Sequence, residues 1–272
     1  MKSHAASAQH NNAERHRARK RFGQNFLRDQ GVIDRIIRAI NPLENEHLLE
    51  IGPGQGALTK QLAASGSKLD CVELDRDLSK HLSAYYQGVE RVSIYQHDIL
   101  KFDLTQLGAA PKSLRVIGNL PYNISTPVLF YLLRSHELIK DMTFMLQVEV
   151  VRRLAAQTGD KNYGRLGLMV QYFCRVDHLF DVPSSAFTPK PKVDSAIVRL
   201  TPHDEMPHKA RSIESLQTVI RTAFNARRKT LKNALKAIIS EQELDRLSLD
   251  SSLRPENLTL ADYVLISNTL TG

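Results

Sequence analysis

Apolar and polar residues follow a repeated rhythm over the first two thirds of the chain. Short apolar runs with the length of buried strands precede segments in which apolar residues recur at helical spacing. A helix at residues 29–40, which Asp29 can cap, comes first. We expect strands at residues 47–52, 68–75, 92–98, 114–119 and 142–147, and helices at 57–65, 76–86, 126–135 and from Glu149 onward. This alternation predicts a parallel sheet with crossover helices.

The pattern changes in the last third of the chain. Two more apolar runs, at residues 166–175 and 193–200, are expected to add strands, but after Pro202 only helical periodicity remains. The helical segments are 214–226, 229–239, 241–247 and 261–270. We therefore expect an α/β fold with helices on both faces of the sheet, followed by a small all-α C-terminal domain. The predicted division is a disordered polar tail at 1–14, an α/β domain at 15–201 and a helical domain at 202–272.

Composition and charge narrow the classes of partner. The 272 residues are 42% hydrophobic and 24% charged, which is typical of a globular protein. The net charge of +8 favours a polyanionic partner, either nucleic acid or an anionic membrane. No apolar run approaches the roughly 20 residues that span a bilayer, and the polar, basic N-terminus does not resemble a secretory signal. With Cys71 and Cys174 expected to be reduced core thiols, these features predict a cytoplasmic protein.

A glycine-rich turn follows the first predicted strand of the α/β region. Gly52, Gly54 and Ala57 fit the loose pattern Gly-x-Gly-x-x-Ala, in which glycines let the backbone pass close under a ligand. The turn alone is compatible with nicotinamide, flavin or adenosylmethionine chemistry, and it also fits an ordinary tight βα turn.

Two carboxylates mark the ends of the next two predicted strands. Glu73 is placed to accept hydrogen bonds from both hydroxyls of a ribose, and Asp98 to accept one from an adenine amino group. Taken singly, each is compatible with a solvated loop carboxylate. Because the carboxyl ends of three consecutive parallel strands meet at one edge of the sheet, together they favour an adenosine cofactor.

The fourth predicted strand ends in the tetrapeptide Asn119-Leu120-Pro121-Tyr122. The Asn119 side-chain oxygen and the Leu120 carbonyl can accept hydrogen bonds from an aromatic amine and aim its lone pair at a methyl group. Pro121 stiffens the loop, and Tyr122 can stack on a base taken out of its helix. As an isolated segment it also fits an Asn/Pro turn with a core tyrosine.

Three segments carry a resemblance to a known family. Residues 19–27 (RKRFGQNFL), 119–125 (NLPYNIS) and 186–195 (AFTPKPKVDS) resemble the ribosomal RNA adenine N6 dimethyltransferases, and their bacterial small-subunit branch in particular. The likeness covers nearly the whole chain after residue 14. It implies a Rossmann-like class I methyltransferase fold, with S-adenosyl-L-methionine as cofactor and S-adenosyl-L-homocysteine as product.

The resemblance also implies roles for individual residues. Gln24, Asn25 and Leu27 would close over the cofactor. Gly52 would approach its methionine part, Glu73 its ribose and Asp98 its adenine, while Asn119 would bridge cofactor and target. Phe187 would form a second aromatic wall against the flipped adenine, although without the family likeness it fits a hydrophobic plug in a proline-rich loop. No metal is expected, because no His, Cys or carboxylate group shows metal-ligand spacing.

By the same resemblance, the substrate is a pair of adjacent adenosines in a hairpin near the 3′ end of 16S rRNA. Each would receive two methyl groups, four transfers in all, on the 30S subunit or its precursor, as a contribution to subunit biogenesis. We expect a monomer with no DNA or membrane partner. The helical domain is expected to bind RNA through a basic run that also fits a solvated helix face, made of Arg221, Arg227, Arg228, Lys229 and Lys232.

Two rival functions stay open on the sequence. One is the same chemistry on another substrate, as in a DNA adenine methyltransferase or a large-subunit RNA methyltransferase. The other is an assembly factor that acts mainly by binding pre-ribosomal particles.

Overall fold

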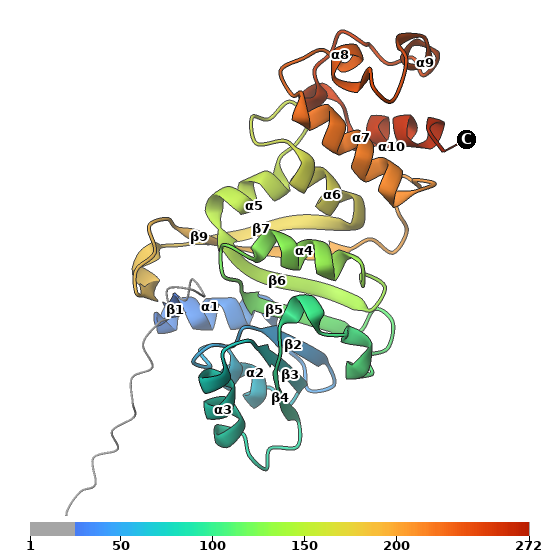
Figure 1. Cartoon of the computed structure of the whole chain (residues 1–272). Coiled ribbons are helices and arrows are strands. Elements are labelled where there is room, and N and C mark those ends of the chain that lie inside the picture. Colours follow the sequence, from blue (N-terminus) through green and yellow to red (C-terminus); the bar gives the residue numbers. More distant parts are fainter. Residues whose placement is uncertain (1–24, 272) are drawn as a thin grey trace, which may run out of the picture.

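The computed structural model describes residues 25–271 (Figure 1). The predicted tail at 1–14, the basic residues between positions 15 and 21 and Gln24 lie outside the described residues. Among residues 25–271, no helix is long and apolar enough to cross a membrane.

A seven-stranded sheet in the order β4-β3-β2-β5-β6-β9-β7 forms the centre of the molecule. Strands β4, β3, β2, β5 and β6 are parallel, whereas β9 pairs antiparallel with both β6 and β7. The order runs outward in opposite directions from β2 and β5, which places a topological switch point between these two strands. The bounds are β2 His47–Ile51, β3 Lys68–Glu73, β4 Val92–Gln96, β5 Leu114–Asn119, β6 Ile139–Gln147, β7 Cys174–Val182 and β9 Ser195–Pro202.

Helices cover both faces of the sheet, as the alternation predicts. The neighbouring residues Leu48 and Leu49 of β2 are both fully buried but belong to different core clusters, because successive strand side chains point to opposite faces. One cluster contains α1 and α2, and the other contains α4, α5 and α6. The bounds are α1 Gln30–Ile40, α2 Thr59–Ala64, α3 Arg76–Tyr85, α4 Ser125–Leu133, α5 Val148–Ala155 and α6 Arg165–Phe173.

The strand predicted at residues 166–175 is wrong, because this run forms helix α6, and the strand β7 begins only at Cys174. Leu168, Met169 and Val170 are consecutive and all buried, since α6 packs against α5 on one side and α7 on another. A helix buried nearly all round loses the polar face that reveals its period. A Cβ on Gly167 would lie 2.4 Å from the Arg153 carbonyl oxygen, so glycine permits the close approach to α5.

The C-terminal helices pack onto the α4–α6 layer instead of forming a separate core. Leu216 and Val219 of α7 and Tyr263 of α10 are fully buried and belong to the same cluster as the α/β strands. Figure 1 shows these helices grouped beyond α5 and α6, on the side away from α1–α3. Their bounds are α7 Ile213–Asn225, α8 Leu231–Leu235, α9 Glu241–Arg246 and α10 Leu260–Thr269.

A two-stranded ribbon that the sequence pattern did not predict joins distant segments. Strand β1 (Phe26–Leu27) pairs antiparallel with β8 (Phe187–Thr188), so that Leu27 lies opposite Phe187. The Arg28 N–H also donates to the Ala186 carbonyl at 2.8 Å. Cys71 and Cys174 are free and buried, as expected.

Candidate functional site

A cavity of about 530 Å³ opens at the switch point of the sheet. It is bordered by the loops that follow β2, β3, β4 and β5, together with the segment that begins at Asn25. Ligands of open α/β sheets bind in this place, outside the carboxyl ends of the strands. Among the predicted site residues, the following line it: Asn25, Leu27, Gly52, Glu73, Asp98, Asn119, Leu120, Pro121 and Tyr122.

The glycine turn after β2 forms the floor of this cavity. Gly52 and Gly54 have φ angles of +65° and +60°, which L residues with a side chain rarely adopt. A Cβ on Gly52 would meet no atom within 4 Å, so the open space begins directly at its backbone. The Gly52 N–H donates to the Val72 carbonyl at 2.9 Å, which fixes the turn to β3.

Glu73, at the end of β3, is only 6% exposed and is held by the main chain. Its Oε2 accepts from the Gly54 N–H at 3.0 Å, and its Oε1 accepts from the Asp75 N–H at 2.8 Å. Burial raises the pKa of the Glu73 carboxyl. Because each carboxylate oxygen has two lone pairs, both oxygens keep an acceptor site for a ligand after these bonds are made.

Asp98 follows β4 and lies half-buried at the cavity. One carboxylate oxygen accepts from the Leu100 N–H at 3.0 Å and caps the 3₁₀ helix Ile99–Lys101. The cap fixes the side chain beside the cavity and leaves the second oxygen for another donor. Asp98 thus has a structural role as a cap, and its role as an acceptor for the cofactor stays a prediction.

Asn119 ends β5 and is tied to the N-terminal segment. Its Nδ2 donates to the Asn25 carbonyl oxygen at 3.2 Å. Since a carbonyl only accepts, the amide atom that faces it must be the nitrogen Nδ2. The oxygen Oδ1 is left as the acceptor end of the side chain. The Leu120 N–H donates to the Met145 carbonyl at 3.3 Å, and the Ile124 N–H donates to the Pro121 carbonyl at 3.1 Å, so the following turn is anchored at both ends.

The two aromatic residues of the predicted site differ in position. Tyr122 lines the cavity, its hydroxyl lies 2.8 Å from Ser195 Oγ, and burial raises the pKa of its phenol. Phe187 is 4% exposed and packs in the core cluster with Leu27 and Ile33; its side chain is not among those that line the cavity in the described structure. In this conformation Phe187 occupies the position of a hydrophobic plug, and its stacking role stays a prediction.

Three residues that sequence reasoning missed also line the cavity. Arg28 donates from its guanidinium to the Gln55 side-chain oxygen, which joins the N-terminal segment to the glycine turn. Glu50 is 2% exposed on β2, and burial raises the pKa of its carboxyl to about 7. The signal for Glu50 was present, because a carboxylate two residues before Gly52 interrupts an otherwise apolar strand.

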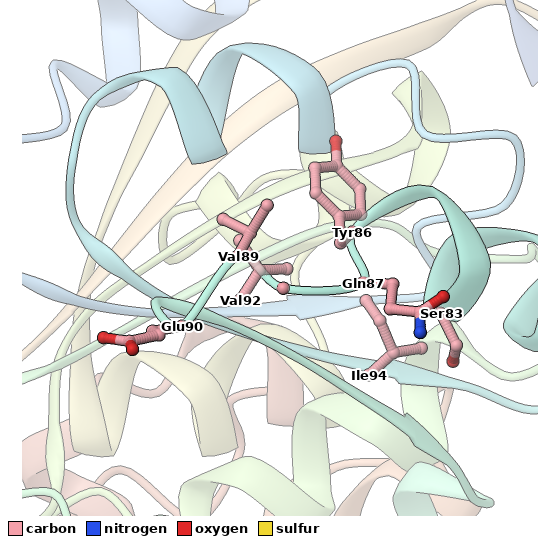
Figure 2. Close-up of a pocket in the computed structure, with 8 residues that line it drawn as sticks. Ser83, Tyr86, Gln87, Val89, Glu90, Val92 and Ile94 are labelled. Atoms are coloured by element: carbon pink, nitrogen blue, oxygen red, sulfur yellow. The ribbon is translucent and has the colours of Figure 1, made fainter.

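A second, more open hollow of about 300 Å³ lies at the edge strand β4 and the end of α3 (Figure 2). Its lining includes Ser83, Tyr86, Gln87 and Ile94, while Glu90 points away from the others in Figure 2. None of the predicted site residues lines it. Within residues 25–271, no group of three or more His, Cys, Asp or Glu side chains is arranged to hold a metal ion.

Comparison with known proteins identifies the family. The family model described as ribosomal RNA adenine dimethylase matches residues 15–271. The ribosomal RNA small subunit methyltransferase A of Pseudomonas fluorescens is 58% identical over 255 residues, which cover 94% of each chain. The chain belongs to the ribosomal RNA adenine dimethylase family. The family predicted from the sequence motifs is thereby confirmed, as is the enzyme class of methyltransferase.

Solved structures agree with this membership of the dimethylase family. A dimethyladenosine transferase from Plasmodium falciparum superposes with a TM-score of 0.75 at 27% identity, covering 89% of this chain and 95% of that one. The 23S rRNA methyltransferase ErmE superposes with a TM-score of 0.70 at 25% identity, covering 91% and 100%. The predicted class I methyltransferase fold with a helical C-terminal part is confirmed.

Proposed function

We propose that the chain transfers methyl groups from S-adenosyl-L-methionine to the N6 amine of adenosines in small-subunit ribosomal RNA. The observation that carries the proposal is the amide of Asn119, held by the Asn25 carbonyl at the end of β5 so that its oxygen is left as an acceptor. An acceptor at this position suits an amine that must be oriented for attack on a methyl group.

The cavity residues fit an adenosylmethionine molecule. Glu73 presents two oxygens, each already held by one main-chain N–H, to the two hydroxyls of a ribose. Asp98 offers its second carboxylate oxygen to an adenine amino group, and the open space above Gly52 admits the methionine part. Leu27 and Asn25 lie at the same cavity and would cover the cofactor.

The residues of the β5 loop would orient the target amine. When bound, adenosylmethionine supplies a methyl group on a sulfonium; each transfer forms a C–N bond, breaks a C–S bond and releases one proton. Asn119 Oδ1 and the Leu120 carbonyl accept the two N–H groups of N6 and direct its lone pair toward the cofactor side of the cavity. Pro121 stiffens the turn that carries the Leu120 carbonyl. Positioning and exclusion of water are the main catalytic effects in this proposal.

Aromatic side chains would hold the base itself. Tyr122 lines the cavity and would stack on one face of an extruded adenine. Phe187 would form the opposite wall, which requires that the β1–β8 ribbon open enough to admit the base from the side where Leu27 pairs with Phe187. Arg28 and Gln55, linked across the glycine turn, would close over the cofactor on the other side.

The small-subunit substrate is favoured over the large-subunit one by the degree of similarity. The bacterial relatives named small-subunit methyltransferases are 55–58% identical over nearly the whole chain, whereas the 23S rRNA methyltransferase is 25% identical. We place the target at two adjacent adenosines in a hairpin near the 3′ end of 16S rRNA, within the 30S subunit or its precursor. In this proposal a cytoplasmic monomer acts during subunit biogenesis.

The helical C-terminal part would bind RNA through a subset of its basic run. Arg228 and Lys229 are exposed and available for phosphates. Arg227 is used differently: its Nε lies 2.6 Å from Glu256 Oε2, and its Nη2 donates to the Lys161 carbonyl at 2.9 Å. Arg227 therefore ties the basic run to the α5–α6 loop.

The test is methyl transfer from labelled adenosylmethionine to purified 30S particles that lack their native methyl marks. The proposal expects transfer by the wild type and at least a 100-fold loss in Asn119→Ala. Asn45→Ala, an exposed asparagine just before β2, is the matched control and should retain the wild-type rate. Tight binding of particles without any methyl transfer would overturn the proposal in favour of an assembly factor. Methyl transfer to duplex DNA at the same rate as to 30S particles would overturn the proposed RNA substrate.

A further inference from the structure

The first residue of β9 contacts the loop that carries Tyr122. Ser195 is 0% exposed and lies between Gln147 of β6 and Val182 of β7 in the sheet. Its Oγ lies 2.8 Å from the Tyr122 hydroxyl. A buried hydroxyl without a partner costs about 1–3 kcal/mol, so the shared hydrogen bond satisfies Ser195 and at the same time holds the tip of the Tyr122 ring.

The residue before it contacts the segment that carries the second aromatic residue. Asp194 Oδ1 accepts from the Ser184 N–H at 2.8 Å, and the Asp194 carbonyl accepts from the Val148 N–H at 3.1 Å. Ser184 begins the 3₁₀ turn Ser184–Ala186, whose chain runs directly into Phe187. Asp194 therefore anchors that turn to the start of β9.

We propose that the dipeptide Asp194-Ser195 positions the two aromatic walls of the base-binding site. Ser195 fixes the Tyr122 ring through its hydroxyl, and Asp194 fixes the turn that leads into Phe187. One rigid strand end thereby anchors both the Tyr122 ring and the turn from which Phe187 would reach the base when the β1–β8 ribbon opens. The inference rests on the proposed function, because the base that these side chains would hold is the target adenine.

Other contacts hold the Tyr122 main chain but not its ring. Ser125 Oγ donates to the Tyr122 carbonyl at 3.2 Å, and the Ile124 N–H closes the turn onto the Pro121 carbonyl at 3.1 Å. With these main-chain contacts alone, the Tyr122 ring could still rotate about its side-chain torsions. Because a displacement of about 1 Å at a reacting group can lower a rate about 100-fold, a hydroxyl partner at the ring tip affects the rate and not only the stability.

A double-mutant cycle tests the Ser195 half of the proposal on methyl transfer to undermethylated 30S particles. Ser195→Ala and Tyr122→Phe each remove one end of the same hydrogen bond, and each should lower kcat about 10-fold while adenosylmethionine affinity stays within about twofold. The double variant should be no slower than the slower single variant. If the double variant lost kcat by the product of the two single losses, the proposal would be overturned, because Ser195 would then affect the rate independently of Tyr122.

Ser267→Ala is the matched control for this cycle. Ser267 is 1% exposed, and its Oγ donates to the Val264 carbonyl at 2.9 Å within α10. The same atom is removed from a buried serine remote from the cavity, so stability should fall while kcat is retained. A Ser195→Ala protein that behaves like Ser267→Ala would also overturn the proposal.

A measurement without substrate separates this inference from the proposed function. Fluorine NMR of protein labelled with fluorotyrosine and fluorophenylalanine reports the Tyr122 and Phe187 rings, which Tyr122→Phe and Phe187→Leu assign. Ser195→Ala should shift the Tyr122 signal, and Asp194→Ala should shift the Phe187 signal. Asp103→Ala, which removes an exposed acceptor of the Thr105 N–H, should shift neither. Unmoved signals in both variants overturn the positioning role, whereas shifted signals in a protein that methylates no RNA support it and overturn the proposed function.

Discussion

The side-chain amide of Asn119 and the main-chain carbonyl of Asn25 are joined by a hydrogen bond of 3.2 Å between segments that lie far apart in the chain. The bond makes the orientation of the amide depend on the seating of the N-terminal segment. That segment is seated in turn by the β1–β8 ribbon and by the contact of Arg28 with Gln55. The seating of the N-terminal segment at the cavity and the orientation of the proposed acceptor, Asn119 Oδ1, are thus parts of one arrangement.

Replacement of Asn119 by aspartate should separate these two parts. The carboxylate keeps an acceptor but has no N–H for the Asn25 carbonyl, and two oxygens would face each other at the contact. We expect kcat to fall about 100-fold, with a smaller change in cofactor affinity. Single-turnover methyl transfer measures the first and calorimetry the second. Asn45→Asp serves as the control, and an Asn119→Asp enzyme of wild-type rate would show that the donor end has no role.

Glu73→Gln should weaken the binding of the cofactor more than it slows methyl transfer. The loss of one charge-assisted hydrogen bond is worth about 1.5–3 kcal/mol, which raises Kd about 10- to 100-fold. Adenosylmethionine and adenosylhomocysteine should be affected equally, because both carry the ribose. Glu90→Gln, an exposed residue of the α3–β4 hollow, is the control for calorimetry. A loss confined to adenosylmethionine would place Glu73 at the sulfonium instead.

The raised pKa of Glu50 predicts that the free energy of unfolding depends on pH. Burial raises the pKa of its carboxyl to about 7, above the unfolded value of about 4.3. Between these two pH values the folded state holds a proton on Glu50 that the unfolded state has lost. The stabilisation from this proton is complete below about pH 4.3 and is lost as the pH rises to about 7, which lowers the free energy of unfolding by roughly 3 kcal/mol at full extent.

The measurement is urea unfolding of the wild type and Glu50→Gln at pH 5 and pH 8. Because glutamine does not ionise, the variant should gain stability relative to the wild type between the two pH values, by about 2–3 kcal/mol. Glu90→Gln should show no such gain. A difference between Glu50→Gln and the wild type that is the same at both pH values would mean that Glu50 is ionised throughout.

Arg227 and Arg228 are neighbours with opposite expected phenotypes. Arg227→Ala removes a partly exposed ion pair to Glu256 and the contact with the Lys161 carbonyl, so we expect a loss of stability of about 1 kcal/mol. Arg228→Ala should leave thermal stability unchanged and weaken binding to 30S particles, with a shallower dependence on salt. Melting curves and binding titrations at several salt concentrations distinguish the two. The reverse assignment of phenotypes would contradict the structure.

The strands were predicted best where a glycine, an acidic residue or an asparagine marks the end of the run. β2, β3, β4 and β5 were predicted at their amino ends and within a few residues at their carboxyl ends for this reason. The error at residues 166–175 has the opposite cause, because α6 is buried on nearly all sides and a uniformly apolar run carries no period. β7 was missed because charged and polar residues interrupt its sequence, CRVDHLFDV, so that no continuous apolar run marks it.

The site was predictable to the extent that it follows parallel strand ends. Gly52, Glu73, Asp98 and Asn119 converge because their strands are neighbours in the sheet. The ribbon of β1 and β8 is two residues long on each side, too short for any alternation to show. The contact of Tyr122 with Ser195 joins the loop after β5 to the first residue of β9, 73 residues later in the chain, and a single sequence contains no sign of such a pairing.

The proposed reaction is tested most directly by locating the transferred methyl groups. After incubation of undermethylated 30S particles with this chain and labelled adenosylmethionine, the 16S rRNA is digested and its nucleosides and 3′-terminal fragments are analysed by mass spectrometry. We expect N6,N6-dimethyladenosine at two adjacent positions in the 3′-terminal hairpin, and none with Asn119→Ala. Label on another nucleoside, on 23S rRNA, or at the same level with Asn119→Ala would contradict it.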